Sequence, residues 1–346
     1  MITMTKKHLY LHIGTHKTGS TSIQHWLKEN RSLLEADGYY YPVEGAYFNN
    51  SEASASLLAH AVLKKRPKYI GNMVINLDAC VSDIRRDIKN SSCTSVIVSS
   101  EHFSHAKKIE EVKNIFDLFS DLFETIRVIV YLRRQDLRLE SSWSQNVKSG
   151  DITLSFDEFF NEDLSAPKWN YFELMAPWIK IFGKDNVMIK PFEKAQFFNN
   201  DLVLDFLETI GFKTDVINPS IKNESPPIEL IETLRLFGSS IPTRAERTAF
   251  FRKFRSIPIK IDRTRYTLFT VEKRKALLNQ YKFSNQLVAK EYLGRSDGLL
   301  FYDSETSKLP VYPGMSLERF SIISRELFQL LVRLNSQLVQ KIRKLP

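Results

Sequence analysis

The stretch LYLHIGTHKTGST, residues 9–21, has the clearest structural pattern in the N-terminal part of this chain. Apolar and polar residues alternate over Leu9–Ile13, a pattern that predicts a short strand. Residues Gly14–Ser20 follow as a loop. Apolar residues then recur at helical spacing, at Ile23, Trp26, Leu27, Leu33 and Leu34. A strand, a glycine-containing loop and a helix in this order can bind a phosphate on the backbone N–H groups of the helix N-terminus.

Three further strands are predicted downstream of this unit, at residues 95–99, 126–132 and 186–190. Helical patterns separate or follow these strands, at residues 81–88, 109–123, 172–182 and 201–210. Pro177 predicts a kink or a break in the third of these helices, and Gly211 closes the fourth. Strands that alternate with helices favour the α/β class, with a parallel sheet flanked by helices on both faces. Such sheets bind ligands at the carboxyl ends of their strands.

The strand signal fades after residue 220, and helical patterns dominate the remainder of the chain. We therefore expect an α/β core over residues 1–220 and a mainly helical C-terminal elaboration over residues 221–346, packed on the core within the same domain. The last helix, residues 316–342, carries an apolar seam that Gln337 interrupts after barely three heptads. This interruption favours packing on its own chain over a dimeric coiled coil.

The charge balance points to an anionic partner. The chain has 346 residues, and 49 Lys and Arg against 40 Asp and Glu give a formal net charge of +9. An excess of this sign suits a nucleic acid, an acidic membrane or a phosphorylated small molecule. The densest basic stretch, residues 244–260, has Phe250, Phe251 and Phe254 among its charges. We interpret it as a solvated helix face and expect no nucleic-acid partner.

Cysteine content and hydropathy indicate the compartment. Cys80 and Cys93 are too few for a disulfide framework and lack metal-ligand spacing, so we expect two reduced thiols. The longest apolar runs, such as Val128–Leu132, have the length of a strand, which excludes a transmembrane helix of about 20 residues. The N-terminal residues lack the apolar segment and cleavage site of a signal peptide. The expected location is the cytoplasm.

The loop departs from the nucleotide-binding P-loop in one decisive position. Gly14 and Gly19 have the spacing of the motif G-x-x-x-x-G-K-[ST], but Ser20 stands where that motif requires Lys, and the lysine lies earlier, at Lys17. In P-loop enzymes the lysine reaches the β- and γ-phosphates and the next hydroxyl holds Mg²⁺. The displacement argues against an ATP-dependent kinase. Considered alone, the loop could also be a simple turn that precedes a helix.

The segment Lys17-Thr18-Gly19-Ser20-Thr21 resembles the 5′-phosphosulfate loop of sulfotransferases that use 3′-phosphoadenosine 5′-phosphosulfate (PAPS), many of them bacterial. A second element of that family, Arg followed eight positions later by Ser after a strand, is matched here by Arg133 and Ser141. The resemblance implies a fold similar to that of P-loop kinases, with residues 1–220 as the PAPS-binding core. The donor-binding residues that it implies are His16, Lys17, Thr18, Gly19, Ser20, Thr21, Arg133 and Ser141.

The doubled arginine leaves a second register open, because Arg134 and Ser142 are also eight positions apart. We prefer the first register, since bacterial members of the family show a similar run with the first arginine in the binding position. A guanidinium suits the 3′-phosphate of the donor because it can form two charge-assisted hydrogen bonds with a phosphate group. A hydroxyl in the first turns of a helix adds a further donor.

Sulfuryl transfer needs positive charge on the bridging oxygen of the donor as it leaves and a base for the acceptor hydroxyl. Lys17 is the candidate for the first role. The predicted strand at residues 95–99 is followed by Ser100-Glu101-His102, which offers Glu101 or His102 as the base, and we prefer Glu101. Family members that act on carbohydrates often use Glu in this region, so the resemblance implies a saccharide or glycolipid acceptor, adenosine 3′,5′-bisphosphate as a product, and no required metal.

Two other functions fit parts of the same pattern. A protein that binds a phosphorylated nucleotide or a nucleic acid without catalysis would keep the basic site but would not need both Lys17 and Glu101. An ATP-dependent small-molecule kinase would need its lysine at the usual P-loop position and a Walker-type Asp after an apolar strand, and the sequence shows neither.

Overall fold

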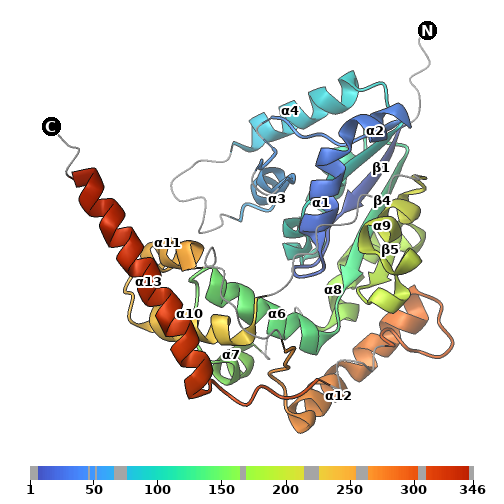
Figure 1. Ribbon diagram of the computed structural model, residues 1–346. Coiled ribbons are helices and arrows are strands. Elements are labelled where there is room, and N and C mark those ends of the chain that lie inside the picture. Colours follow the sequence, from blue (N-terminus) through green and yellow to red (C-terminus); the bar gives the residue numbers. More distant parts are fainter. Residues whose placement is uncertain are drawn as a thin grey trace. The chain divides into compact units, whose positions relative to one another are not determined.

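Five strands form one parallel sheet in the computed structural model, which describes residues 7–45, 47–50, 53–65, 76–163, 169–213, 226–254, 264–302 and 309–342 (Figure 1). The strand order is β2-β3-β1-β4-β5. The bounds are β1 His8–His12, β2 Tyr39–Tyr40, β3 Ser95–Ser99, β4 Thr125–Leu132 and β5 Val187–Pro191. Every pairing in the sheet is parallel. The α/β class, the parallel sheet and the helical C-terminal region predicted from the sequence are confirmed.

The central strands β1 and β4 are buried on both faces. Leu9–His12 of β1 and Val128–Leu132 of β4 are buried without interruption. Strand β4 has the nearly continuous apolar sequence of such a strand, whereas the alternation in β1 does not mark an exposed face, because Tyr10 and His12 are buried as well. The strand β2 was missed. It has two half-buried residues, Tyr39 and Tyr40, which are too few to show an alternation of apolar and polar positions.

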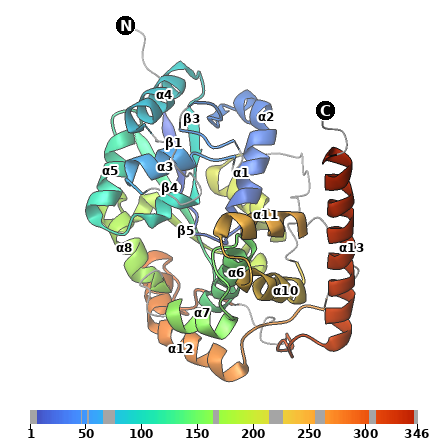
Figure 2. The same cartoon turned by 90° about the vertical axis from the view of Figure 1, so that its left-hand side faces the viewer.

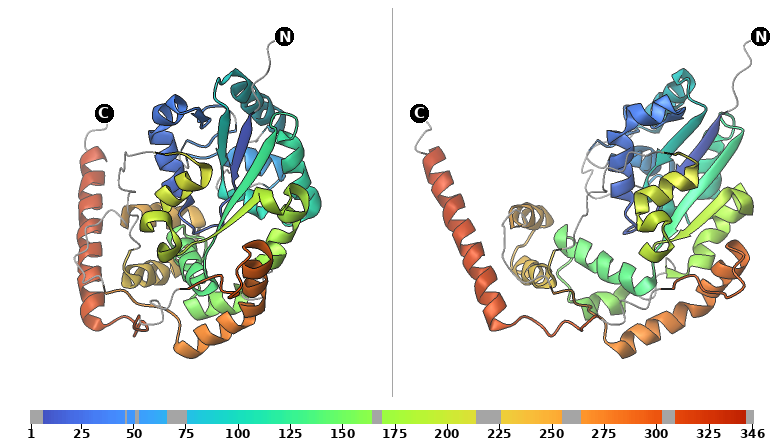
Figure 3. Two further views of the ribbon diagram at one scale, coloured as in Figure 1. Left: turned by 90° about the vertical axis from the view of Figure 1, so that its right-hand side faces the viewer. Right: turned by 45° about the vertical axis from the view of Figure 1, so that its right-hand side comes forward.

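Two layers of helices cover the sheet. On one face α1 (Ser20–Glu29) packs against α9 (Leu202–Ile210), and on the other α5 (Ile109–Phe119) packs against α8 (Tyr171–Phe182), as Figures 2 and 3 show. Shorter or more peripheral helices complete this part of the molecule: α2 Arg31–Ala36, α3 Ser56–Val62 and α4 Leu77–Asn90. Single turns of 3₁₀ or π helix lie at Glu101–His105 (η2), Lys184–Asn186 (η4), Lys194–Gln196 (η5), Phe198–Asn200 (η6) and Val288–Tyr292 (η7).

Two of the predicted helix signals can be compared directly with the structure. Gly211 closes α9 with φ of 78°, a left-handed conformation that glycine adopts without steric cost, as expected. Helix α8 runs from Tyr171 to Phe182 through Pro177, so the proline does not break it.

The chain divides into two compact units, each built from three segments. The first, called here the α/β unit, comprises Met1–Gln135, Pro167–Lys222 and Asn279–Asp303. The second, the helical unit, comprises Asp136–Ala166, Asn223–Leu278 and Ser304–Pro346. The sequence suggested a single boundary at residue 220, a position outside the described residues. Two helices, α6 (Gln135–Lys148) and α12 (Val271–Leu287), belong in part to each unit. Because the helical spacing of apolar residues continues through such a boundary, the sequence does not reveal it.

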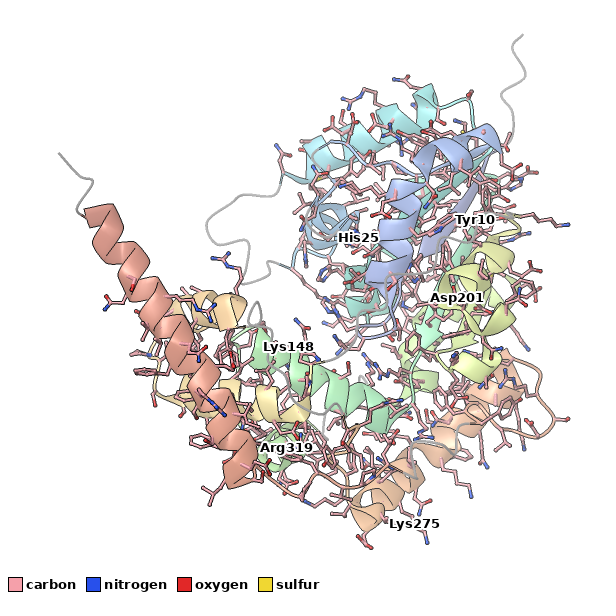
Figure 4. All side chains as sticks on the ribbon, in the orientation of Figure 1. Tyr10, His25, Lys148, Asp201, Lys275 and Arg319 are labelled. Atoms are coloured by element: carbon pink, nitrogen blue, oxygen red, sulfur yellow. The ribbon has the colours of Figure 1, made fainter. Side chains whose placement is uncertain are left out.

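The helical unit has its own buried residues. It contains α7 (Phe156–Asp163), α10 (Ile228–Ser239), α11 (Arg244–Phe254) and α13 (Leu317–Ile342). Helix α13 contacts α10, buries Ile323 and forms an ion pair of 2.6 Å between Arg319, labelled in Figure 4, and Glu229. The α13 helix thus packs on its own chain along its first turns. Across the described parts of both units, none of the helices has the length and apolar character needed to cross a bilayer.

The basic and aromatic stretch at residues 244–260 coincides with α11 over its first eleven residues. Phe251 and Phe254 of this helix are fully buried. These two rings therefore belong to the packing of the helical unit. Residues 255–260 lie outside the described part of the chain.

Candidate functional site

The loops that carry the predicted site residues meet at one edge of the sheet. Strand β1 lies between β3 and β4, with His12 beside Ser99 and Ile129. The pairing continues past the strand ends, because the Ser100 amide donates to the His12 carbonyl at 3.0 Å and the Ile13 amide donates to the Ile129 carbonyl at 3.0 Å. Parallel strands end at the same edge, so the segments after β1, β3 and β4 converge there (Figure 1).

The loop after β1 depends on left-handed backbone conformations. Its φ angles are 45° at Gly14, 70° at Lys17 and 71° at Gly19. A Cβ atom at Gly19 would lie 2.3 Å from Leu202 Cδ2 and 3.3 Å from the Phe192 ring, so the position requires glycine. Lys17 is a non-glycine residue in the same conformation, which is uncommon and is found disproportionately at functional sites.

Hydrogen bonds from threonine side chains hold this loop in place. Thr15 Oγ1 donates to the Tyr131 carbonyl on β4 at 2.8 Å, and Thr18 Oγ1 donates to the Thr15 carbonyl at 2.5 Å. Both threonines are fully buried. The Thr18 hydroxyl is thus part of the loop structure, and any contact of Thr18 with a donor would come from its backbone.

Helix α1 presents its N-terminus to the loop. Gly19 is the N-cap, contributes no side-chain hydrogen bond, and is followed by a first turn without acidic residues. Ser20 is buried in that turn and Thr21 is exposed. A helix N-terminus carries partial positive charge and unsatisfied N–H groups, which together bind anions.

Arg133 joins the end of β4 to the loop. Its Nη1 atom donates to the Lys17 carbonyl at 3.0 Å, and its guanidinium lies 5.5 Å from the centre of the Phe192 ring. The hydroxyl of Tyr171 donates to the Arg133 carbonyl. Arg134, the alternative candidate, is buried, whereas Arg133 is half-buried. Arg133 thus contacts the loop, and the choice between the two registers stays a prediction.

Ser141 lies on α6, in the part of that helix that belongs to the helical unit. Ser142 lies on the same part, and both serines are half-buried. Two other residues of this part are engaged within the unit: Asp136 forms an ion pair of 3.2 Å with Arg274, and Glu140 accepts from the Leu268 amide at 2.7 Å. The pairing of Arg133 with Ser141 stays a prediction.

Glu101 is held by a chain of hydrogen bonds that sequence reasoning missed. Gln24 Nε2 on α1 donates to Glu101 Oε2 at 3.0 Å and to Ser99 Oγ at 3.1 Å. Ser99 Oγ in turn lies 2.8 Å from Nδ1 of His12. Gln24 is buried beside Ile23. In the sequence it is a polar residue three positions before Leu27, on the apolar face of the predicted helix, and this position was the signal that could have revealed its role.

The electrostatic setting of Lys17 is mixed. Burial lowers the pKa of its ammonium group, the charge of Arg133 lowers it further, and the charge of Glu101 raises it. Arg133 and Glu101 therefore both lie close enough to Lys17 to affect its ammonium group. Glu101 is half-buried and lies close to the backbone of Gly14. A Cβ atom added at Gly14 would be only 3.3 Å from Glu101 Cβ.

His102 is surrounded by other histidines. Its ring centre lies 4.3 Å from that of His60 and 5.4 Å from that of His16, and His16 Nε2 lies 2.8 Å from His105 Nε2. Burial lowers the pKa of His105 to about 4, and the neighbouring His102 and Lys65 lower it further. The sequence had suggested His16 and His102 separately, as a donor contact and an alternative base, and had given His60 and His105 no role.

Comparisons with known proteins give few similarities. No family model matches this chain. A protein of Archaeoglobus fulgidus described as an uncharacterized protein is 26% identical over 213 residues, which are 61% of this chain and 57% of that protein. The chain thus spans little more than half the length of this relative. The crystal structure of a sulfotransferase from Alicyclobacillus acidocaldarius aligns over 70% of this chain and 95% of its own, with 17% sequence identity and a TM-score of 0.39.

Proposed function

We propose that this chain is a sulfotransferase that moves the sulfuryl group of PAPS to a hydroxyl group of its acceptor. The observation that carries the proposal is the 3.0 Å hydrogen bond from Arg133 to the Lys17 carbonyl. It joins the two elements that resemble the family's 5′-phosphosulfate and 3′-phosphate motifs, which lie more than a hundred residues apart in the sequence. In this proposal Lys17, Arg133 and the N-terminus of α1 bind one anionic ligand.

In this proposal the loop after β1 binds the 5′-phosphosulfate through the amides of residues 18–21, and Arg133 binds the 3′-phosphate. The S–O bond to the bridging phosphate oxygen breaks as the acceptor oxygen bonds to sulfur. Lys17 stabilises the negative charge that develops on the bridging oxygen. Glu101 accepts the acceptor proton, and adenosine 3′,5′-bisphosphate leaves. The hydrogen bond from Gln24 at 3.0 Å supports this role because it orients the carboxylate.

The donor test is calorimetry with adenosine 3′,5′-bisphosphate in EDTA. We expect binding without magnesium, because Lys17, Arg133 and the α1 N-terminus supply the positive charge that a kinase obtains partly from Mg²⁺. ATP with Mg²⁺ is the control ligand and should bind more weakly. Binding of ATP in preference to the bisphosphate, with Mg²⁺ required, would support the kinase function instead.

The acceptor class is the second part of the proposal. We infer a saccharide hydroxyl, from the glutamate at position 101 and the resemblance to carbohydrate sulfotransferases. Incubation with PAPS labelled in its sulfuryl group, followed by separate assays of oligosaccharides and simple phenols, should label the saccharides. Labelling of phenols alone would reject the acceptor class and keep the donor assignment. A chain that binds the bisphosphate but labels neither pool would fit a non-catalytic binding protein.

A further inference from the structure

Four of the seven histidines of the chain gather beside the loop after β1. They come from three separate segments: His16 from the loop itself, His60 from α3, and His102 and His105 from η2. The η2 turn is a 3₁₀ helix, with three residues per turn, so side chains at positions i and i+3 lie on the same face. This geometry explains why His102 and His105 project together.

Three of these imidazoles present their nitrogen atoms to one another. The ligand atoms of His16, His102 and His105 all lie within 4.8 Å of each other, and the two Nε2 atoms of His16 and His105 are 2.8 Å apart. The ring centres are separated by 4.8 Å for His16 and His105 and by 5.5 Å for His102 and His105. His102 is buried, and the other two are half-buried.

We propose that His16, His102 and His105 bind a divalent transition-metal ion of the Zn²⁺ type. Zinc binds imidazole nitrogen at about 2.0–2.1 Å in tetrahedral geometry, which places its ligand nitrogens roughly 3.3 Å apart. The spacings in this cluster bracket that value, so small side-chain rotations complete the site. Three protein nitrogens leave a fourth position for water or a ligand, as in catalytic zinc sites.

The imidazole ligands determine which metal ions can bind. Imidazole prefers Zn²⁺, Co²⁺, Ni²⁺ and Cu²⁺, whereas Mg²⁺ and Ca²⁺ prefer oxygen ligands. A neighbouring cation, Lys65, donates to the His105 carbonyl at 2.6 Å and is paired with Glu111 at 2.9 Å. That ion pair reduces the repulsion between Lys65 and a bound cation.

A metal at this position would connect the loop after β1 to η2. It would fix His16 beside Lys17 and would use the nitrogen lone pair of His102, so His102 could not accept a proton from the acceptor. The metal site stands on the histidine geometry alone and does not depend on the proposed sulfotransferase activity. A bound metal leaves Glu101 as the base of the two candidates in the proposed reaction.

The experiment uses full-length protein stripped with EDTA and dialysed free of chelator, without nucleotide. We expect ZnCl₂ to bind at one ion per chain in calorimetry, CoCl₂ to give the visible absorption of a tetrahedral complex, and MgCl₂ to give neither. His16→Gln and His105→Gln should each weaken Zn²⁺ binding at least ~100-fold, since loss of an outer-shell partner alone costs about 10–100-fold. His25→Gln, on α1 (Figure 4), is the matched control and should bind as the wild type does.

Folding of each variant is checked by thermal unfolding in EDTA, and His16→Gln is the safer of the two because His16 lies on a loop and is half-buried. Absence of stoichiometric Zn²⁺ binding to the wild type would overturn the proposal. So would wild-type affinity in both folded variants. Neither result depends on the donor-binding experiment, so the two proposals fail independently.

Discussion

Single residues shape the loop after β1, and Gly19 shows how. Gly19→Ala places a methyl group in a left-handed backbone and 2.3 Å from Leu202 Cδ2. We expect a loss of roughly 2–4 kcal/mol in the free energy of unfolding, the sum of backbone strain and overpacking. Gly294→Ala is the control, because Gly294 has φ of 66° and no atom within 4 Å of the added methyl. Urea unfolding of both variants measures the difference, and equal losses would contradict the packing argument.

Arg133 and Arg134 are neighbours with different surroundings, so their substitutions should differ. Arg133→Ala should weaken binding of adenosine 3′,5′-bisphosphate by roughly 2–4 kcal/mol, because one partner of a charge-assisted contact is removed. Affinity for AMP, which lacks the 3′-phosphate, should change little. Calorimetry of Arg134→Ala provides the comparison. A larger loss in that variant, confined to the bisphosphate, would move the register to Arg134 and Ser142.

Substitutions of Glu101 and of Lys17 should differ in their effects on turnover and on bisphosphate affinity. Glu101→Gln keeps the shape of the side chain and an acceptor for Gln24, but it removes the proposed base, so turnover should fall by about 10²–10⁴-fold with bisphosphate affinity within about threefold. Lys17→Ala should lower both turnover and affinity, because in the proposed mechanism Lys17 contacts the donor in the ground and transition states. His102→Asn is measured beside them. Normal turnover in Glu101→Gln together with a loss in His102→Asn would reject the glutamate assignment.

At the scale of elements, the contact between β1 and β3 contains a fully buried histidine. His12 bonds Ser99 across the two strands, and burial lowers its pKa to about 3 from an ordinary value near 6.5. The folded chain thus keeps His12 neutral where the unfolded chain is protonated. Its stabilising contribution is complete above pH 6.5 and is lost as the pH falls from 6.5 toward 3, by at most about 1.4 kcal/mol per pH unit.

His12→Gln should therefore flatten the dependence of unfolding free energy on pH between 6.5 and 4. The glutamine amide can still bond Ser99 and does not titrate. Urea unfolding at several pH values in this range measures the slope, and His25→Gln controls for loss of a histidine outside the strand contact. A slope in His12→Gln equal to that of the wild type would show that His12 does not carry the effect.

At the scale of the whole molecule, the two units differ in how far the sequence anticipates them. The fold class of the α/β unit and four of its five strands were predicted from the sequence. Buried parallel strands have apolar runs, and amphipathic helices have apolar residues at helical spacing, so both are visible in the local sequence. The helical unit was predicted only as helical. Its segments are interleaved with those of the α/β unit, and the division falls inside α6 and α12.

The β1 strand, the glycine loop and α1 could be predicted from the sequence, and so could the edge of the sheet at which Lys17, Glu101 and Arg133 lie. Local spacing and the rule that parallel strands end at one edge are sufficient for that. The three-dimensional structure was needed to show that Arg133 bonds the Lys17 carbonyl, that Gln24 bonds Glu101, and that His16, His102 and His105 form one cluster. These contacts join residues 77 to 116 positions apart in the first two cases. Periodicity records whether a side chain is buried but carries no information about which distant side chain it will touch.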